Sequence, residues 1–162
     1  MLVEKKSKFI ASVSPCRTEA EALDFLKTIK SKYPDATHNV YAYIIDENNI
    51  YRYSDDGEPG GTAGMPVLDT IRKEELVDVC VVVTRYFGGT LLGTGGLVHA
   101  YGACAKQGLT EAEIITKCLC NVVTVNVDYH LSGKVQYKIS NEKLMLDNVD
   151  YGNDVVFYVC CP

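Results

Sequence analysis

Hydrophobic positions recur with a helical period in the first of four segments that are predicted to be helices. The apolar positions on one side of this segment are Ala22, Phe25, Leu26 and Ile29. Thr18 and Glu21 precede it with capping-box spacing, and Pro34 is expected to end the helix. Further helices are predicted at 65–76, 95–107 and 131–144. Gly108 is predicted to be the C-terminal cap of the third helix.

Between these helices, runs of β-branched and aromatic residues predict strands. The predicted strands are 8–13, 37–45, 50–54, 122–127, 146–151 and 154–160. Residues 79–84 form an almost unbroken apolar run, which is typical of a central strand covered on both faces. Gly152 and Asn153 provide turn chemistry between the last two strands.

The order of these elements predicts an α+β fold in two domains, with helices gathered on one side of the sheets. A composition shift places the boundary near residue 117, which gives domains of residues 1–117 and 118–162. The second domain is small for an independent core and ends directly on a strand. An unpaired terminal strand would be an exposed edge. The second domain is therefore expected to lean on the first, to pair with another chain through that edge as an oligomer, or to lack a C-terminal part.

Composition excludes several classes of protein. A formal net charge of −5 argues against chain-wide affinity for nucleic acid, although a local basic cluster is compatible with it. The seven cysteines show neither a Cys-x-x-Cys pair nor zinc-site spacing, and no segment has the length of a membrane span. We expect a cytoplasmic protein with no membrane association and no cofactor.

Two glycine-rich segments, residues 52–66 and 81–97, follow predicted strands and lead into predicted helices. Backbone N–H groups at such helix starts attract anions. The candidate anion site consists of Arg85, Gly88, Gly89, Gly93, Gly95 and Gly96. The alternative is that these glycines only permit tight turns beneath a closely packed helix.

A second group of candidates is polar. Asp55, Asp56 and Glu58 can hold a cation or act as acid and base, and His38 starts a strand that can face the same surface. The alternative is a loop whose carboxylates cap backbone N–H groups, with His38 as a hydrogen-bonded structural residue.

Six motifs resemble the YigZ/IMPACT family, over about residues 4–117. They are Tyr-Ser-Asp-Asp-Gly-Glu-Pro at 53–59, Gly-Thr-Ala-Gly at 61–64, Val-Val-Thr-Arg-Tyr-Phe-Gly-Gly at 82–89, Asp-Ala-Thr-His-Asn at 35–39, Lys-Ser-Lys-Phe-Ile-Ala at 6–11 and Gly-Gly-Leu-Val at 95–98. The resemblance implies a first domain similar to domain IV of elongation factor G, a four-stranded sheet backed by two helices with a left-handed βαβ crossover. It implies a partial ferredoxin-like second domain that lacks the final helix and strand, through a truncated form or a short gene.

The resemblance also implies a link to translation, since eukaryotic members regulate translation by binding a partner of a stress-responsive kinase. Nucleic-acid or ribosome binding by bacterial members is an inference from fold similarity. Our leading hypothesis is a non-enzymatic regulatory or binding protein that engages RNA, the ribosome or a protein partner through the two glycine-rich loops. Arg85→Ala is then expected to weaken binding and leave folding intact.

Two further hypotheses remain open. One is a small enzyme acting on a phosphorylated or peptide substrate, with Asp55, Asp56, Glu58 and His38 as its polar cluster around a closed pocket that also contains Arg85. The other is an adaptor that docks a larger regulatory protein. An electropositive surface would favour RNA, and an exposed apolar patch would favour the adaptor.

Overall fold

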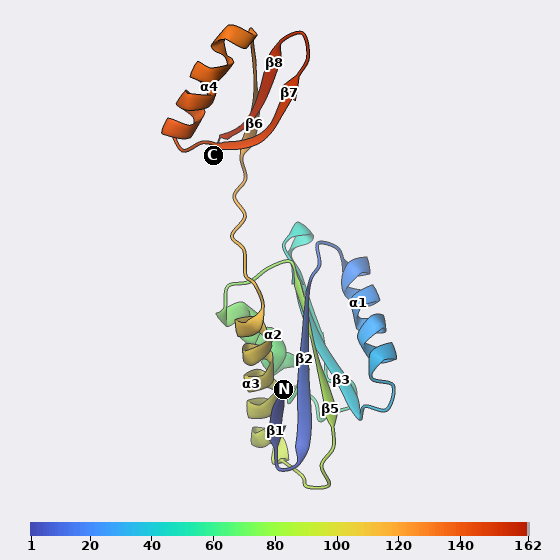
Figure 1. The fold of residues 1–162 in the computed structure, drawn as a ribbon. Coiled ribbons are helices and arrows are strands. Elements are labelled where there is room, and N and C mark those ends of the chain that lie inside the picture. Colours follow the sequence, from blue (N-terminus) through green and yellow to red (C-terminus); the bar gives the residue numbers. More distant parts are fainter. Residues whose placement is uncertain (162) are drawn as a thin grey trace. The chain divides into compact units, whose positions relative to one another are not determined.

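The computed structural model describes residues 1–161, and the chain divides into two compact units, Met1–Ile114 and Ile115–Pro162 (Figure 1). Each unit contains its own antiparallel sheet. The α+β fold class is therefore confirmed. The predicted boundary at residue 117 stays a prediction.

The sheet of the first unit has five strands in the order β1-β2-β5-β3-β4. The strands are β1 (Leu2–Glu4), β2 (Ser7–Pro15), β3 (His38–Ile45), β4 (Ile50–Ser54) and β5 (Val79–Tyr86). Four strands were expected in this sheet. The additional strand is β1, which is too short to show a pattern in the sequence. β5 lies in the centre, as its apolar run predicts, and pairs antiparallel with both β2 and β3.

Helices cover both faces of this sheet (Figure 1). On one face lies α1 (Glu19–Lys32), and on the other lie α2 (Gly64–Lys73) and α3 (Gly93–Glu111). The expectation that the helices share one side is therefore wrong for this unit. Because β5 is apolar on both of its sides, both faces of the sheet need a cover. The left-handed sense of the crossovers stays a prediction.

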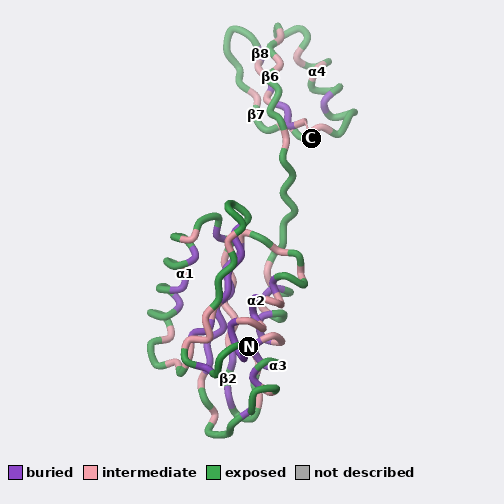
Figure 2. The backbone as a smooth tube through the Cα atoms, turned by 180° about the vertical axis from the view of Figure 1, so that it is seen from behind, coloured by how far each residue is buried: buried purple, intermediate pink, exposed green. Residues whose placement is uncertain are grey.

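Two clusters of buried side chains correspond to these two faces, and Figure 2 shows the buried residues along the central strands and the inner helix faces. Val81 and Val83 face α2 and α3, whereas Cys80 and Val82 face α1. Alternate residues of one strand thus fill both cores, as the strand period of two requires.

The predicted ends of α1 are close to those observed. Thr18 Oγ1 accepts a hydrogen bond from the Glu21 N–H at 3.2 Å, as a capping residue does. The Glu21 side chain bonds the N–H of Arg17 at 2.7 Å and not that of Thr18, so only half of the capping box forms.

The predicted cap at Gly108 is wrong, because α3 continues to Glu111. Gly108 lies inside the helix, where a Cβ atom would come within 2.6 Å of the Ala11 Cβ atom in β2. Its function is close packing of α3 on the sheet.

The second unit has the element order of a partial ferredoxin-like domain. It contains β6 (Asn121–Val127), α4 (Tyr129–Asn141), β7 (Met145–Tyr151) and β8 (Val155–Cys161). The strand order is β6-β8-β7, so the last strand is the middle one. The expectation that the terminal strand is a free edge for an oligomer is therefore wrong, because β6 and β7 form the edges.

Among residues 1–161, no helix combines the length and the apolar character that crossing a bilayer would require.

Candidate functional site

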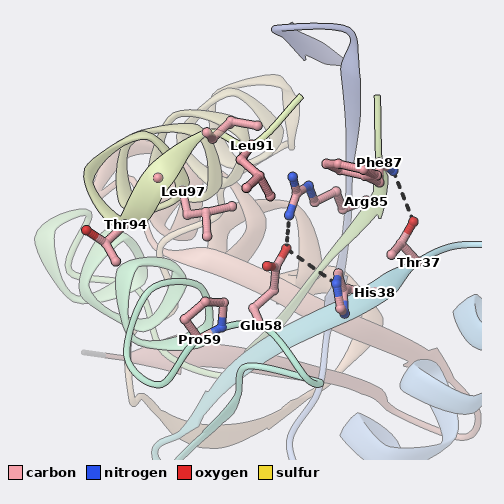
Figure 3. A pocket seen from close by; sticks show the side chains of 11 residues that line it. Thr37, His38, Glu58, Pro59, Arg85, Phe87, Leu91, Thr94 and Leu97 are labelled. Carbon is pink, nitrogen blue, oxygen red and sulfur yellow. Dashed lines mark hydrogen bonds and ion pairs between the residues drawn. The ribbon is translucent and has the colours of Figure 1, made fainter. Parts of the chain in front are cut away.

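The two glycine-rich loops meet at one pocket in the first unit, with a volume of about 420 Å³ (Figure 3). It is lined by Thr37, His38, Glu58, Pro59, Arg85, Phe87, Leu91, Leu92, Gly93, Thr94 and Leu97. The first loop supplies Glu58 and Pro59, and the second supplies the segment that leads into α3. The volume lies in the range of ligand pockets.

The polar floor of this pocket consists of Arg85, Glu58 and His38, and strand pairing brings Arg85 and His38 together. Arg85, near the end of β5, lies directly opposite Phe9 of β2 and His38 of β3. The Thr37 N–H donates to the Arg85 carbonyl at 2.9 Å, and the Phe87 N–H donates to Thr37 Oγ1 at 3.0 Å. The backbone on both sides of Arg85 is therefore held in place.

The Arg85 guanidinium is engaged in a buried ion pair. Its Nη1 lies 2.5 Å from Glu58 Oε1, and the two side chains are only 5% and 4% exposed. Nη2 makes a long 3.4 Å contact with Ser7 Oγ, and Nε has no hydrogen-bond partner among the described residues. The expectation that Arg85 offers a free cation to an anion is therefore wrong, because Glu58 already neutralises it.

Aromatic rings enclose the guanidinium. The Arg85 Cζ atom lies 5.5 Å from the ring centroids of both Phe9 and Phe87, at the distance of cation–π contacts. The ring of Phe9 in turn meets the Tyr101 ring edge-on at 5.1 Å. The charge is therefore held within a mostly apolar shell.

Glu58 Oε1 also accepts a hydrogen bond from the Tyr101 hydroxyl at 2.7 Å. Burial and this hydrogen bond to Glu58 raise the pKa of Tyr101 well above its ordinary value of 10.0. The phenol therefore stays neutral and serves as a hydrogen-bond donor to the carboxylate.

His38 borders the same carboxylate, and one hydrogen bond fixes its tautomer. Nδ1 lies 2.8 Å from the carbonyl oxygen of Asp56, and a carbonyl only accepts, so Nδ1 carries a proton. Nε2 lies 3.8 Å from Glu58 Oε1, which is too far for a hydrogen bond. In the neutral ring, Nε2 is thus an acceptor at the pocket.

Asp55 and Asp56 do not line the pocket. Asp55 accepts the N–H groups of Gly61, Ala63 and Gly64 at 2.8–3.0 Å, and so caps the start of α2. Asp56 accepts the Asn39 N–H at 2.7 Å and pairs with Lys30 at 3.1 Å. The four-residue polar cluster of the enzyme hypothesis is therefore not assembled, and the capping alternative describes both aspartates.

The candidate glycines have separate functions. Gly88 allows close approach, because a Cβ atom there would come within 2.1 Å of the Lys6 carbonyl carbon. Gly89 and Gly93 have φ angles of 81° and 76°, in the left-handed region that favours glycine. Gly95 and Gly96 belong to the first turn of α3. Of the candidate glycines, only Gly93 lines the pocket.

The pocket walls are apolar and were not anticipated. Leu91 is 81% exposed and Phe87 is 47% exposed, and both lie on the loop between β5 and α3. Leu97 and Pro59 complete the wall seen in Figure 3. The Leu91 and Phe87 side chains both lie beside the pocket and are accessible from outside it. The signal in the sequence is the leucine pair at 91–92, which lies outside any periodic pattern.

In the described part of the chain, no group of three or more His, Cys, Asp or Glu side chains is arranged to hold a metal ion.

Comparison with known proteins places this site in a family. Residues 5–109 match the family model of the Impact N-terminal domain, so the match contains both glycine-rich loops and every pocket residue. The chain belongs to the IMPACT family. The IMPACT family member YvyE of Bacillus subtilis is 41% identical over 157 residues, which cover 96% of this chain and 72% of that protein.

Other IMPACT relatives extend the comparison. The IMPACT family member YigZ of Escherichia coli is 34% identical, across 98% of this chain and 79% of its own length. The protein IMPACT homolog of Dictyostelium discoideum is 43% identical over 105 residues, 60% of this chain and 29% of that protein. The crystal structure of a hypothetical protein at 34% identity superimposes with a TM-score of 0.69, over 99% of this chain and 81% of that one.

Proposed function

We propose that this chain is a non-enzymatic regulatory protein that docks a partner polypeptide in the pocket between its two glycine-rich loops. The supporting observation is the combination of exposed Leu91 and Phe87 with a floor whose charges are paired internally. An exposed apolar patch next to a pocket is the feature that distinguishes a protein-docking adaptor from a phosphate-binding surface.

The partner belongs to the translation apparatus or its regulators in this proposal. Support comes from membership of the IMPACT family, together with the implied activity of its eukaryotic members, which regulate translation through a protein partner. The proposal includes a cytoplasmic location. RNA and the ribosome itself are the competing partners, and nuclease treatment separates them from a protein partner.

The test is a pull-down with and without nuclease, using the wild-type chain and two variants, from a lysate of Bacillus subtilis, whose YvyE is 41% identical to this chain. Leu91→Asp puts a charge on the pocket rim without disturbing the core, since the side chain is exposed. Leu23→Asp is the matched control, because Leu23 is 48% exposed on α1, at the opposite face of the sheet.

We expect a protein that survives nuclease, binds the wild type and the Leu23→Asp variant, and is lost with Leu91→Asp. Loss of all captured protein on nuclease treatment would instead identify RNA as the partner. Equal capture by the Leu91→Asp variant would show that the pocket is not the docking surface.

A further inference from the structure

We infer that the pocket takes an uncharged peptide unit with an aliphatic side chain, from within a segment of the partner and not from its charged ends. This inference rests on the proposed function and names the chemistry of what docks. Three features of the pocket carry it: the neutral floor, the free hydrogen-bonding groups and the apolar walls.

The floor has no uncompensated charge to offer. Arg85 and Glu58 neutralise each other at 2.5 Å. A phosphate or carboxylate would lose its hydration on entering and would meet the Glu58 carboxylate beside the paired guanidinium. A free ammonium would lose its hydration in the same way, and the only carboxylate among the described residues that line the pocket is already paired with the guanidinium. A neutral amide only exchanges hydrogen bonds with water for hydrogen bonds with the pocket.

The pocket offers both acceptors and donors. His38 Nε2 is an acceptor, and none of the described hydrogen bonds ends on Glu58 Oε2. No side chain among residues 1–161 caps the start of α3, whose residues Gly93 and Thr94 line the pocket. The first N–H groups of a helix have no partner within it, so this end can donate to a carbonyl. One peptide unit, with one N–H and one C=O, uses both kinds of group.

The walls fit an aliphatic side chain. Leu91, Leu92, Leu97, Phe87 and Pro59 surround the space, and Figure 3 shows Leu91 and Leu97 on one side with His38 across from them. Burying such a side chain supplies favourable free energy of binding, at roughly 25 cal/mol for each Å² of apolar surface removed from water.

Three leucine derivatives test this inference; they share the aliphatic side chain and at least one peptide unit, and differ in their terminal groups and charge. N-acetyl-leucine-N′-methylamide is neutral, N-acetyl-leucine is anionic, and leucine-N′-methylamide is mainly cationic at pH 7, where a histidine ring is mainly neutral. Inorganic phosphate is a fourth probe. Titration of the ¹⁵N-labelled chain, followed by amide chemical shifts of the pocket residues, gives a Kd for each.

We expect the neutral probe to bind with a Kd of roughly 1–10 mM, as suits a ligand of this size, and each charged probe to bind at least about fivefold more weakly. Equal or tighter binding of N-acetyl-leucine, leucine-N′-methylamide or phosphate would overturn the inference. So would the absence of shifts at the pocket with every probe.

Two variants probe the cause of the preference. Glu58→Gln removes the carboxylate that neutralises Arg85, so the order of affinities should reverse in favour of N-acetyl-leucine. If that variant does not fold, Leu91→Lys adds a cation at an exposed rim position and should strengthen N-acetyl-leucine binding at least about threefold relative to the neutral probe. Leu23→Lys, on the opposite face of the sheet, should leave the ratio unchanged. An unchanged ratio in the folded pocket variants would contradict the inference.

The two proposals fail separately. A partner that is resistant to nuclease and depends on Leu91, together with tighter binding of the anionic probe, would keep the proposed function and overturn only the preference for an uncharged peptide unit. A partner lost with nuclease would overturn the proposed function itself.

Discussion

A single carboxylate oxygen organises the residues of the pocket floor. Glu58 Oε1 accepts hydrogen bonds from Arg85 Nη1 at 2.5 Å and from the Tyr101 hydroxyl at 2.7 Å, and it lies 3.8 Å from His38 Nε2. These groups come from the first glycine-rich loop, β5, α3 and β3. The loss of one member therefore leaves another buried group without its partner, so stability and ligand selection are linked at this atom.

Arg85→Ala is accordingly expected to destabilise the fold by about 3–5 kcal/mol, because it leaves the Glu58 carboxylate buried and unpaired. The buried pair thus reverses the expectation from sequence that this substitution leaves folding intact. Urea denaturation of the variant gives the value.

Arg72→Ala serves as the control, since Arg72 is 48% exposed and its 3.7 Å pair with Asp69 lies at the surface. The loss there should stay within about 0.5 kcal/mol. The double variant Arg85→Ala/Glu58→Ala should lose less than the sum of its single changes. Equal losses at Arg85 and Arg72 would show that the buried pair is not needed for folding.

Tyr101 gives the fold a dependence on high pH. Its pKa is raised above 10.0 by burial and by Glu58, so the native state keeps a proton that the unfolded chain releases. Stability is present in full below pH 10 and falls as the pH rises further, by about 1.4 kcal/mol for each pH unit from this residue. Tyr101→Phe should therefore show a shallower loss, measured as urea midpoints at pH 9 to 11. An identical pH slope in the variant would refute this contribution.

At this scale the sequence correctly brought His38, Glu58 and Arg85 together, but it wrongly added the two aspartates and did not show how the groups pair. Asp55, Asp56 and Glu58 are chemically similar neighbours, and only the path of the loop decides that the first caps α2 while the third meets Arg85. Tyr101 was missed because its partner lies 43 positions away. The available signal was the tyrosine itself, because its polar hydroxyl stands out on a helix face made otherwise of small residues.

At the scale of elements, the contact between α3 and the sheet depends on small side chains. Ala100, Cys104 and Ala105 are fully buried or nearly so, and Gly108 meets Ala11 of β2. This close approach positions the start of the same helix at the pocket. The packing of one end of α3 therefore supports the binding surface at its other end.

Gly108→Ala and Gly95→Ala form a matched pair within this helix. The first should destabilise the unit by about 1–3 kcal/mol, because its methyl group would lie 2.6 Å from the Ala11 Cβ atom. Apart from neighbouring residues of the same helix, no atom lies within 4 Å of the methyl group added by the second, so its effect should range from neutral to a gain of about 1 kcal/mol. Thermal unfolding of both variants tests this contrast, and equal effects would contradict the packing argument.

The sequence predicted which segments form helices and strands better than it predicted where those elements end. The apolar run of β5 correctly predicted a central strand, and Thr18 correctly predicted the start of α1. Gly108 was misassigned because glycine is common both at helix ends and at close contacts, and only Ala11, 97 positions earlier in the chain, shows which applies.

At the scale of the whole molecule, the two units are joined by residues 112–120, which form no helix or strand and are mostly exposed. The first unit contains two buried clusters and the second contains one of its own. The pocket lies entirely in the first unit. The predicted division at residue 117 can therefore be tested by separating the units.

Limited trypsin treatment should cut first at Lys117, which is exposed within this segment. The resulting fragment 1–117 should unfold cooperatively and keep the probe affinities of the full chain, because it contains both cores of the first unit. Mass spectrometry identifies the cut, and circular dichroism follows unfolding. Early cleavage within 1–114, or a fragment without a thermal transition, would contradict this organisation.

The central place of β5 has a consequence for synthesis. β2 and β3 do not touch each other as sheet neighbours, because β5 lies between them and pairs with both. A growing chain that has not yet reached residue 79 thus lacks the strand that joins its earlier pieces, and it cannot complete this sheet until that strand emerges.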